Sequence, residues 1–134
     1  MTTRGIRNRN PGNIRRSAAD WRGKIAGDDA EFETFVHEVY CLRALAKTLL
    51  TYQKRHGLTR IRDFIARWAP PVENDTEAYI RAVSAATNRA TTDFYDVTDP
   101  AALAALVAAI IRHENGVQPY SDKTIREGVA LALA

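Results

Sequence analysis

The amino-acid sequence predicts a mainly α-helical protein of the α+β type, with about five helices and a small β-hairpin or loop lobe near the N-terminus. Apolar residues recur at helical spacing in five segments after residue 37. The preceding part instead carries turn-forming residues and one short stretch of alternating polar and aromatic residues. Because 134 residues, 46% of them hydrophobic, suffice for a core, we expect one domain over residues 1–134.

The N-terminal lobe is expected to combine a loop with a hairpin. Residues 4–24 contain the turn sequence Asn10-Pro11-Gly12-Asn13, which predicts an ordered loop or an irregular strand region. Residues 31–35 alternate polar and aromatic side chains and predict a half-buried strand. A partner strand near residues 23–26 would form a hairpin around Gly27-Asp28-Asp29.

The first three predicted helices follow in order. Helical spacing of apolar residues covers about residues 38–55, and Gly57 is a typical helix end. Thr59 is the expected cap of the second helix, which Pro70-Pro71 stops. The polar run at residues 74–77 predicts the start of the third helix.

Two more helices complete the predicted fold. Asp99-Pro100 opens the fourth, which is rich in alanine and apolar through Ile111. Since few of its positions are polar, we expect it to be the buried central helix. Ser121 or Asp122 is expected to cap the last helix.

Composition narrows the functional classes. The net charge is +3, and seven basic residues crowd the first 24 positions, namely Arg4, Arg7, Arg9, Arg15, Arg16, Arg22 and Lys24. Such a patch suits a polyanion, either nucleic acid or the anionic bacterial cell wall. No apolar run is long enough for a membrane span, and the N-terminus does not resemble a signal peptide. Neither metal-binding nor nucleotide-binding motifs are present, so we expect no metal and no cofactor.

Glu114 is the candidate catalytic acid. It directly follows the apolar fourth helix, at a helix end whose dipole is already partly negative. Apolar surroundings and that dipole both favour the protonated form of a carboxyl group. A protonated carboxyl beside the leaving oxygen is what glycoside cleavage requires. The alternative is a solvated glutamate in front of an ordinary Asn115-Gly116 helix end.

A second carboxylate and sugar-binding side chains complete the predicted site. Among the acidic residues on or beside the hairpin, Glu31 is the candidate, because a hairpin carboxylate can face a cleft; a solvated strand face is the alternative. Aromatic rings stack on sugars, and amide side chains bind N-acetyl groups. The substrate-binding candidates on this basis are Asn10, Asn13, Trp21, Trp68, Tyr79 and Tyr120. Packing in the core and turn formation are the competing roles for these residues.

Several segments of the chain resemble phage and prophage virion proteins. The resemblance begins with residues 4–15 and Trp21-Arg22-Gly23, and continues through Trp68-Ala69-Pro70 to His113-Glu114-Asn115-Gly116. It therefore spans nearly the whole chain. Arg9 and Cys41 depart from the residues expected in that family, which are Asn and Gly, and Asn115 replaces the Ser that follows the catalytic glutamate in murein glucosaminidases. This resemblance implies a virion protein and says little about mechanism.

A second resemblance implies a fold and an activity. Murein glucosaminidases of the lysozyme-like superfamily have an Asn-rich stretch, a Trp-x-Gly, a short hairpin and a Thr-Asp-x-x-Tyr segment, to which residues 10–15, 21–23, 31–35 and 75–79 are similar in that order. In those enzymes the catalytic glutamate precedes the Asn-rich stretch, whereas here Glu114 lies near the C-terminus. The resemblance thus implies a circularly permuted lysozyme-like domain, which is compatible with termini that lie close together at the surface. It assigns Glu114 as the acid, Glu31 as the hairpin carboxylate, and Asp75 and Tyr79 to the substrate.

The sequence therefore favours an enzyme that cleaves the glycan strands of peptidoglycan, by hydrolysis or as a lytic transglycosylase. A catalytically silent virion or wall-binding module is the first alternative, and a small nucleic-acid-binding protein is the second. The expected partners are peptidoglycan and, for delivery, phage virion or secretion components. We expect synthesis in the bacterial cytoplasm and action at the cell wall after lysis, virion delivery or specialised secretion, without membrane insertion.

Overall fold

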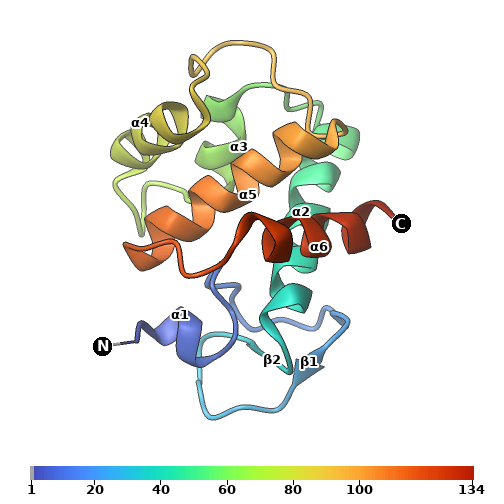
Figure 1. Cartoon of the computed structure of the whole chain (residues 1–134). Helices are drawn as coiled ribbons and strands as arrows, with labels where there is room; N and C mark the ends of the chain where they lie inside the picture. The colour runs from blue at the N-terminus through green and yellow to red at the C-terminus, as the bar shows by residue number, and fades with distance from the viewer. Residues whose placement is uncertain (1) are drawn as a thin grey trace.

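The computed structural model describes residues 2–134, and most of them are helical. Five helices form the larger part of the molecule: α2 (Glu38–His56), α3 (Ile61–Trp68), α4 (Thr76–Thr87), α5 (Pro100–Asn115) and α6 (Asp122–Leu133). The N-terminal lobe holds the short helix α1 (Arg4–Arg7) and the strands β1 (Lys24–Ile25) and β2 (Thr34–Phe35), below the helices in Figure 1. Among residues 2–134, no helix has the length and apolar character needed to cross a bilayer.

Helix α5 is the central helix, as its composition predicts. It packs against α4, α6, α2 and α1. Its buried face includes Leu103, Leu106, Val107, Ile110 and Ile111. Asp99 caps it, Pro100 occupies the first turn, and Gly116 ends it in the left-handed conformation with φ 75°. These local features fix the position of Glu114, which lies in the last turn of the helix.

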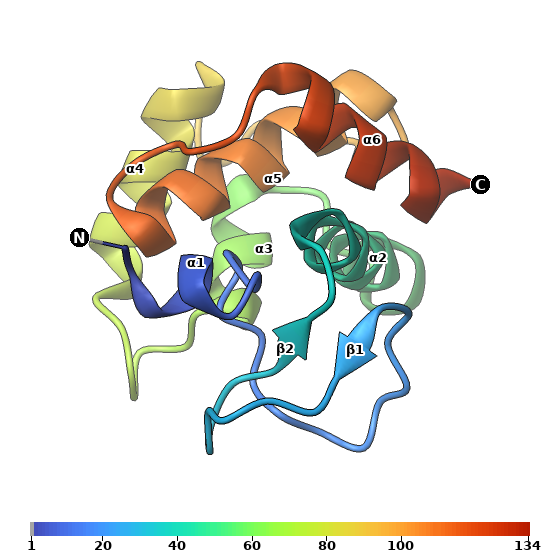
Figure 2. The same ribbon diagram turned by 60° about the horizontal axis from the view of Figure 1, so that its bottom comes forward.

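Helix α2 joins the two parts of the molecule, and in Figure 2 it is seen end-on between the hairpin and α6. One face contributes Leu42, Leu45 and Leu49 to the main core. Cys41 and Ala44 instead pack with Phe35 in a smaller cluster where α2 meets the N-terminal lobe. The lobe is thereby fixed to the helices by apolar burial.

The short helix α1 was not predicted, because residues 4–24 were expected to form a loop or irregular strand. Thr3 caps it by accepting a hydrogen bond from the Ile6 amide. Buried Gly5 lets it lie close to its neighbours, since a Cβ there would come within 2.7 Å of Asn13 Oδ1 and 2.8 Å of the Asn10 carbonyl. Glycine is a poor helix former, so tertiary packing rather than local propensity explains this helix.

The hairpin is confirmed, but it is shorter than predicted. Lys24 and Ile25 pair antiparallel with Phe35 and Thr34, and a separate bridge joins Arg15 to Phe32. Residues 31–33 lie outside β2. The helix caps are as predicted at Asp75 and Ser121, whereas the expected cap Thr59 is wrong, because Arg60 precedes α3 and makes no side-chain cap.

Candidate active site

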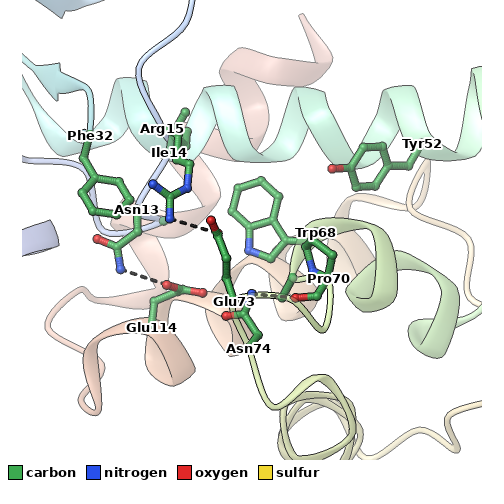
Figure 3. Close-up of a pocket in the computed structure, with 12 residues that line it drawn as sticks. Asn13, Ile14, Arg15, Phe32, Tyr52, Trp68, Pro70, Glu73, Asn74 and Glu114 are labelled. Atoms are coloured by element: carbon green, nitrogen blue, oxygen red, sulfur yellow. Dashed lines mark hydrogen bonds and ion pairs between the residues drawn. The ribbon is translucent and has the colours of Figure 1, made fainter. Parts of the chain in front are cut away.

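A cleft of about 380 Å³ lies where the N-terminal lobe meets the helices. Its walls come from five parts of the chain: residues 12–15, Phe32, Tyr52 on α2, the end of α3 with the loop that follows it, and the end of α5. Figure 3 shows the polar and aromatic side chains that line it. The lining residues are Gly12, Asn13, Ile14, Arg15, Phe32, Tyr52, Trp68, Ala69, Pro70, Glu73, Asn74 and Glu114.

Glu114 is half-buried in the wall of this cleft and accepts two hydrogen bonds. The Tyr79 hydroxyl donates to Oε2 at 2.7 Å, and Asn13 Nδ2 donates to Oε1 at 2.8 Å. Both donors are uncharged, and they come from α4 and from the N-terminal loop. The carboxyl group is therefore held in one orientation by groups that lie far apart in the sequence.

Tyr79 is almost fully buried, with 1% of its surface exposed. Burial, the charge of Glu114 and their hydrogen bond raise the pKa of the Tyr79 hydroxyl well above its usual range, and the Trp68 side chain opposes this shift only in part. The phenol thus stays protonated at any pH the protein meets. The His113 ring packs on the Tyr79 ring with centroids 3.8 Å apart, which further restricts the tyrosine.

The turn that carries Asn13 is built by Asn10. The Asn10 side chain is fully buried; it donates to the carbonyls of Ile14 and Glu33 and accepts from the Ile14 amide. Asn13 itself has φ 52°, a left-handed conformation that asparagine tolerates better than most residues. Asn10 therefore supports the loop, while Asn13 reaches the cleft.

Asn115 ties the N-terminal segment to the end of α5. Its buried side chain donates to the carbonyls of Pro11 and Ile111, both at 2.8 Å, and accepts from the Thr3 hydroxyl at 2.7 Å. The contact with Pro11 joins residues 104 positions apart in the sequence. This residue thereby brings Asn13 within reach of Glu114.

A second carboxylate lines the cleft on the loop between α3 and α4. Glu73 Oε2 accepts a hydrogen bond of 2.9 Å from Arg15, so an ion pair crosses the cleft (Figure 3). The Arg15 guanidinium also lies over the Phe32 ring, 5.0 Å from its centroid. The sequence prediction missed Glu73, Arg15, Phe32 and Tyr52. The only local indication for Glu73 is its position in a loop shortly after Trp68.

Among the predicted site residues, Glu114, Asn13 and Trp68 line the cleft. Tyr79 is not part of the lining but is hydrogen-bonded to Glu114. Glu31 is exposed and lies outside the lining; its carboxylate is 3.5 Å from Arg15 and 3.8 Å from Arg4.

Three of the predicted substrate-binding residues, Trp21, Asp75 and Tyr120, pack in the protein or cap a helix instead. Trp21 packs against the small cluster of Phe35, Cys41 and Ala44. Asp75 caps α4 by accepting from the Ala78 amide. Tyr120 packs on the main core, where burial raises the pKa of its hydroxyl to about 12. None of these three is among the residues that line the cleft.

The N-terminal basic residues are largely engaged in internal contacts. Arg4 pairs with Asp29, Lys24 pairs with the buried Glu33, and Arg9 donates to the Phe35 carbonyl. Arg15 and Arg16 also have protein partners. Much of the predicted basic patch therefore stabilises the lobe, which leaves less charge free for a polyanion.

Fold and site together define a mainly helical domain in which an N-terminal lobe and the end of a central helix enclose a cleft with two carboxylates. No model of a known protein family matches the chain. Protein P5 of Pseudoalteromonas phage PM2 is 42% identical over 130 residues, which cover 93% of this chain and 79% of that protein. The chain belongs to the family of this phage protein.

Proposed function

We propose that this protein cleaves the glycan strands of peptidoglycan and that Glu114 is its general acid. The observation that carries the proposal is the paired donation of Tyr79 and Asn13 to a carboxyl group in the wall of a cleft. A carboxyl group in fixed orientation at a cleft is what proton transfer to a glycosidic oxygen needs. When Glu114 is protonated, the Tyr79 hydroxyl oxygen can accept a hydrogen bond from it, so the same contact suits both states.

The cleft has surfaces suited to sugars. Trp68 lines it and offers an aromatic face on which a pyranose ring can stack. The rings of Phe32 and Tyr52 also line the cleft, and arginine guanidinium groups lie over both of them. Asn74 and Asn13 offer amide groups that can orient N-acetyl and hydroxyl groups. This mixture of aromatic and amide side chains favours a glycan over a purely anionic polymer.

The resemblance to lysozyme-like glucosaminidases adds support through the two hydrogen bonds that Glu114 accepts. That resemblance assigns the glutamate as the acid and the tyrosine of the Thr-Asp-x-x-Tyr segment to the substrate, and here Tyr79 and Asn13 of the Asn-rich stretch each donate a hydrogen bond to Glu114. Termini that lie close together are not found, since α1 and the end of α6 lie on opposite sides in Figures 1 and 2. The proposal of a permuted lysozyme-like domain therefore rests on the hydrogen bonds from Asn13 and Tyr79 to Glu114 alone.

The phage relative supports a place of action. Since Protein P5 belongs to a phage, we propose that this protein reaches the cell wall with a virion or at lysis, with virion components as partners. A non-catalytic virion module is the second candidate function. The observation that favours it is the Arg15–Glu73 ion pair, which crosses the cleft and takes up part of the space that a glycan would need.

The test is release of dye from labelled murein sacculi by the wild type and by Glu114→Gln. We expect release by the wild type and a loss of about 100-fold or more in the variant, because general acid catalysis contributes that much. Glu127→Gln, an exposed change of the same kind on α6, is the matched control and should retain activity. No release by the wild type over a range of pH values and wall types would favour the non-catalytic module.

A further inference from the structure

We infer that Glu73 is the second catalytic carboxylate and that it makes the reaction a hydrolysis, with Glu73 as the base that activates water. The inference rests on the proposed function and assigns a residue that the sequence prediction did not consider. Among the described residues that line the cleft, Glu73 and Glu114 are the acidic ones, and they come from different walls (Figure 3). Glycoside hydrolysis generally uses such a pair.

The two carboxylates have unlike surroundings. Glu114 is half-buried and bonded to the neutral donors Tyr79 and Asn13. Glu73 is paired with the guanidinium of Arg15, and 52% of its side-chain surface is exposed. Both oxygens of Glu114 are thus held in one orientation, whereas Glu73 is held through one oxygen and is open to solvent. A general acid must be fixed against the glycosidic oxygen and a base must meet water, so position and access favour Glu114 as the acid and Glu73 as the base.

Arg15 acts as a positioning residue for Glu73. Its guanidinium lies over the Phe32 ring and reaches Glu73 Oε2 with a hydrogen bond of 2.9 Å. Within residues 2–134, Glu73 Oε1 makes no hydrogen bond, so one oxygen remains for a water molecule while the other is held. Glu31, exposed and outside the lining, has no such access to the cleft.

The proposed reaction is an acid- and base-catalysed displacement by water. Glu114 gives its proton to the glycosidic oxygen as the bond from that oxygen to the anomeric carbon breaks. A water oxygen forms a new bond to the anomeric carbon, and Glu73 takes the proton that this water loses. Solvent then returns a proton to Glu114 and removes one from Glu73. The products are two shorter glycans, one with a new reducing end, and no anhydro sugar forms.

The experiment compares wild type, Glu73→Gln, Glu73→Ala and Glu31→Gln on murein sacculi, with reducing ends and product masses as readouts. Glu31→Gln is the matched control, because it removes the other carboxylate near Arg15. We expect Glu73→Gln to lose about 100-fold or more, and Glu31→Gln to stay within roughly threefold of wild type, as for an exposed ion pair. Azide or formate should restore part of the activity to Glu73→Ala and none to Glu114→Gln, which a merely structural role would not produce.

Three results of this experiment would overturn the assignment of Glu73 as the base. Wild-type activity with Glu73→Gln close to it, while circular dichroism shows both folded, would overturn the base assignment and leave the proposed function standing. Anhydro products from the wild type would also overturn it, because they form without water. An inactive wild type would remove the proposed function and this inference together.

Discussion

The Tyr79 hydroxyl and Glu114 Oε2 form a hydrogen bond of 2.7 Å that joins the first half of α4 to the last turn of α5. The tyrosine is buried and the pKa of its hydroxyl is raised, so it keeps its proton and holds the carboxyl group in place. Position and orientation of the proposed acid therefore depend on the packing of two helices. The predictions below test this dependence and the contacts around it.

Replacing Tyr79 with Phe is expected to lower murein cleavage by roughly tenfold or more while the fold persists, because the carboxyl group loses its buried partner. The free energy of unfolding should fall by about 1–2 kcal/mol, as for one lost hydrogen bond to a charged group. Tyr95→Phe is the control, since that buried hydroxyl donates to the Ala102 carbonyl outside the cleft lining. If both variants retained full activity, Tyr79 would have no part in the chemistry.

Replacing Asn13 with Gly tests the hydrogen bond to Glu114 without adding backbone strain. Glycine adopts the φ of 52° at little cost, so the variant loses the donor and keeps the turn. We expect activity to drop by about tenfold, with a change in unfolding free energy below about 1 kcal/mol. Asn88→Gly, at a φ of 55° at the end of α4, is the control. Equal activities of the two variants would argue against a role for Asn13.

Replacing Asn115 with Ala is expected to loosen the N-terminal segment. Three buried hydrogen bonds are lost, to Thr3, Pro11 and Ile111, and the free energy of unfolding should fall by about 2–4 kcal/mol. Hydrogen exchange followed by mass spectrometry should show faster exchange in residues 3–13 and little change in α2. Uniform acceleration through the whole chain would contradict a local role.

The stability of the lobe is expected to depend on pH through Asp29. The Arg4 guanidinium holds the pKa of this carboxyl group below its usual range, and hydrogen bonds from the Glu31 amide and the Asn8 side chain add to the shift. A depressed folded-state pKa contributes stability that is fully present above the unfolded value, near 3.9, and is lost as the pH falls below it. Asp29→Asn should therefore be less stable than wild type at pH 7.

Denaturant unfolding of both proteins between pH 7 and pH 2 checks this prediction. The difference between wild type and Asp29→Asn should stay constant down to about pH 4 and shrink at lower pH. Asp28→Asn, beside it in the sequence, serves as the control. A difference that grew as the pH fell would have the wrong sign for the proposed contact.

Local sequence features predict most of the helical part. Asp99 and Pro100 set the start of α5 through local capping, as predicted. The helix continues past Ile111 to Asn115, so Glu114 lies within its last turn rather than after it, and Gly116 ends the helix. The main apolar faces follow from periodicity in the same way. The unpredicted α1 depends on Gly5 fitting against Asn10 and Asn13, a contact that no local propensity encodes.

The candidate site was predicted less completely, because its contacts are remote in sequence. Asn13 and Glu114 are 101 residues apart, and Arg15 and Glu73 are 58 apart. Hairpin position made Glu31 the candidate for the second carboxylate, but the loop after α3 brings Glu73 into the cleft instead. Asp75 and Trp21 illustrate the same difficulty, since capping and packing use the residue types that bind sugars.

The most direct measurement of the central claim is mass spectrometry of the soluble products that purified sacculi release on incubation with wild type and with Glu114→Gln. The account predicts disaccharide-containing fragments with new reducing ends from the wild type, and none above background from the folded variant. Identical fragments from both proteins would contradict Glu114 as the acid. The absence of fragments from the wild type would contradict the enzyme itself.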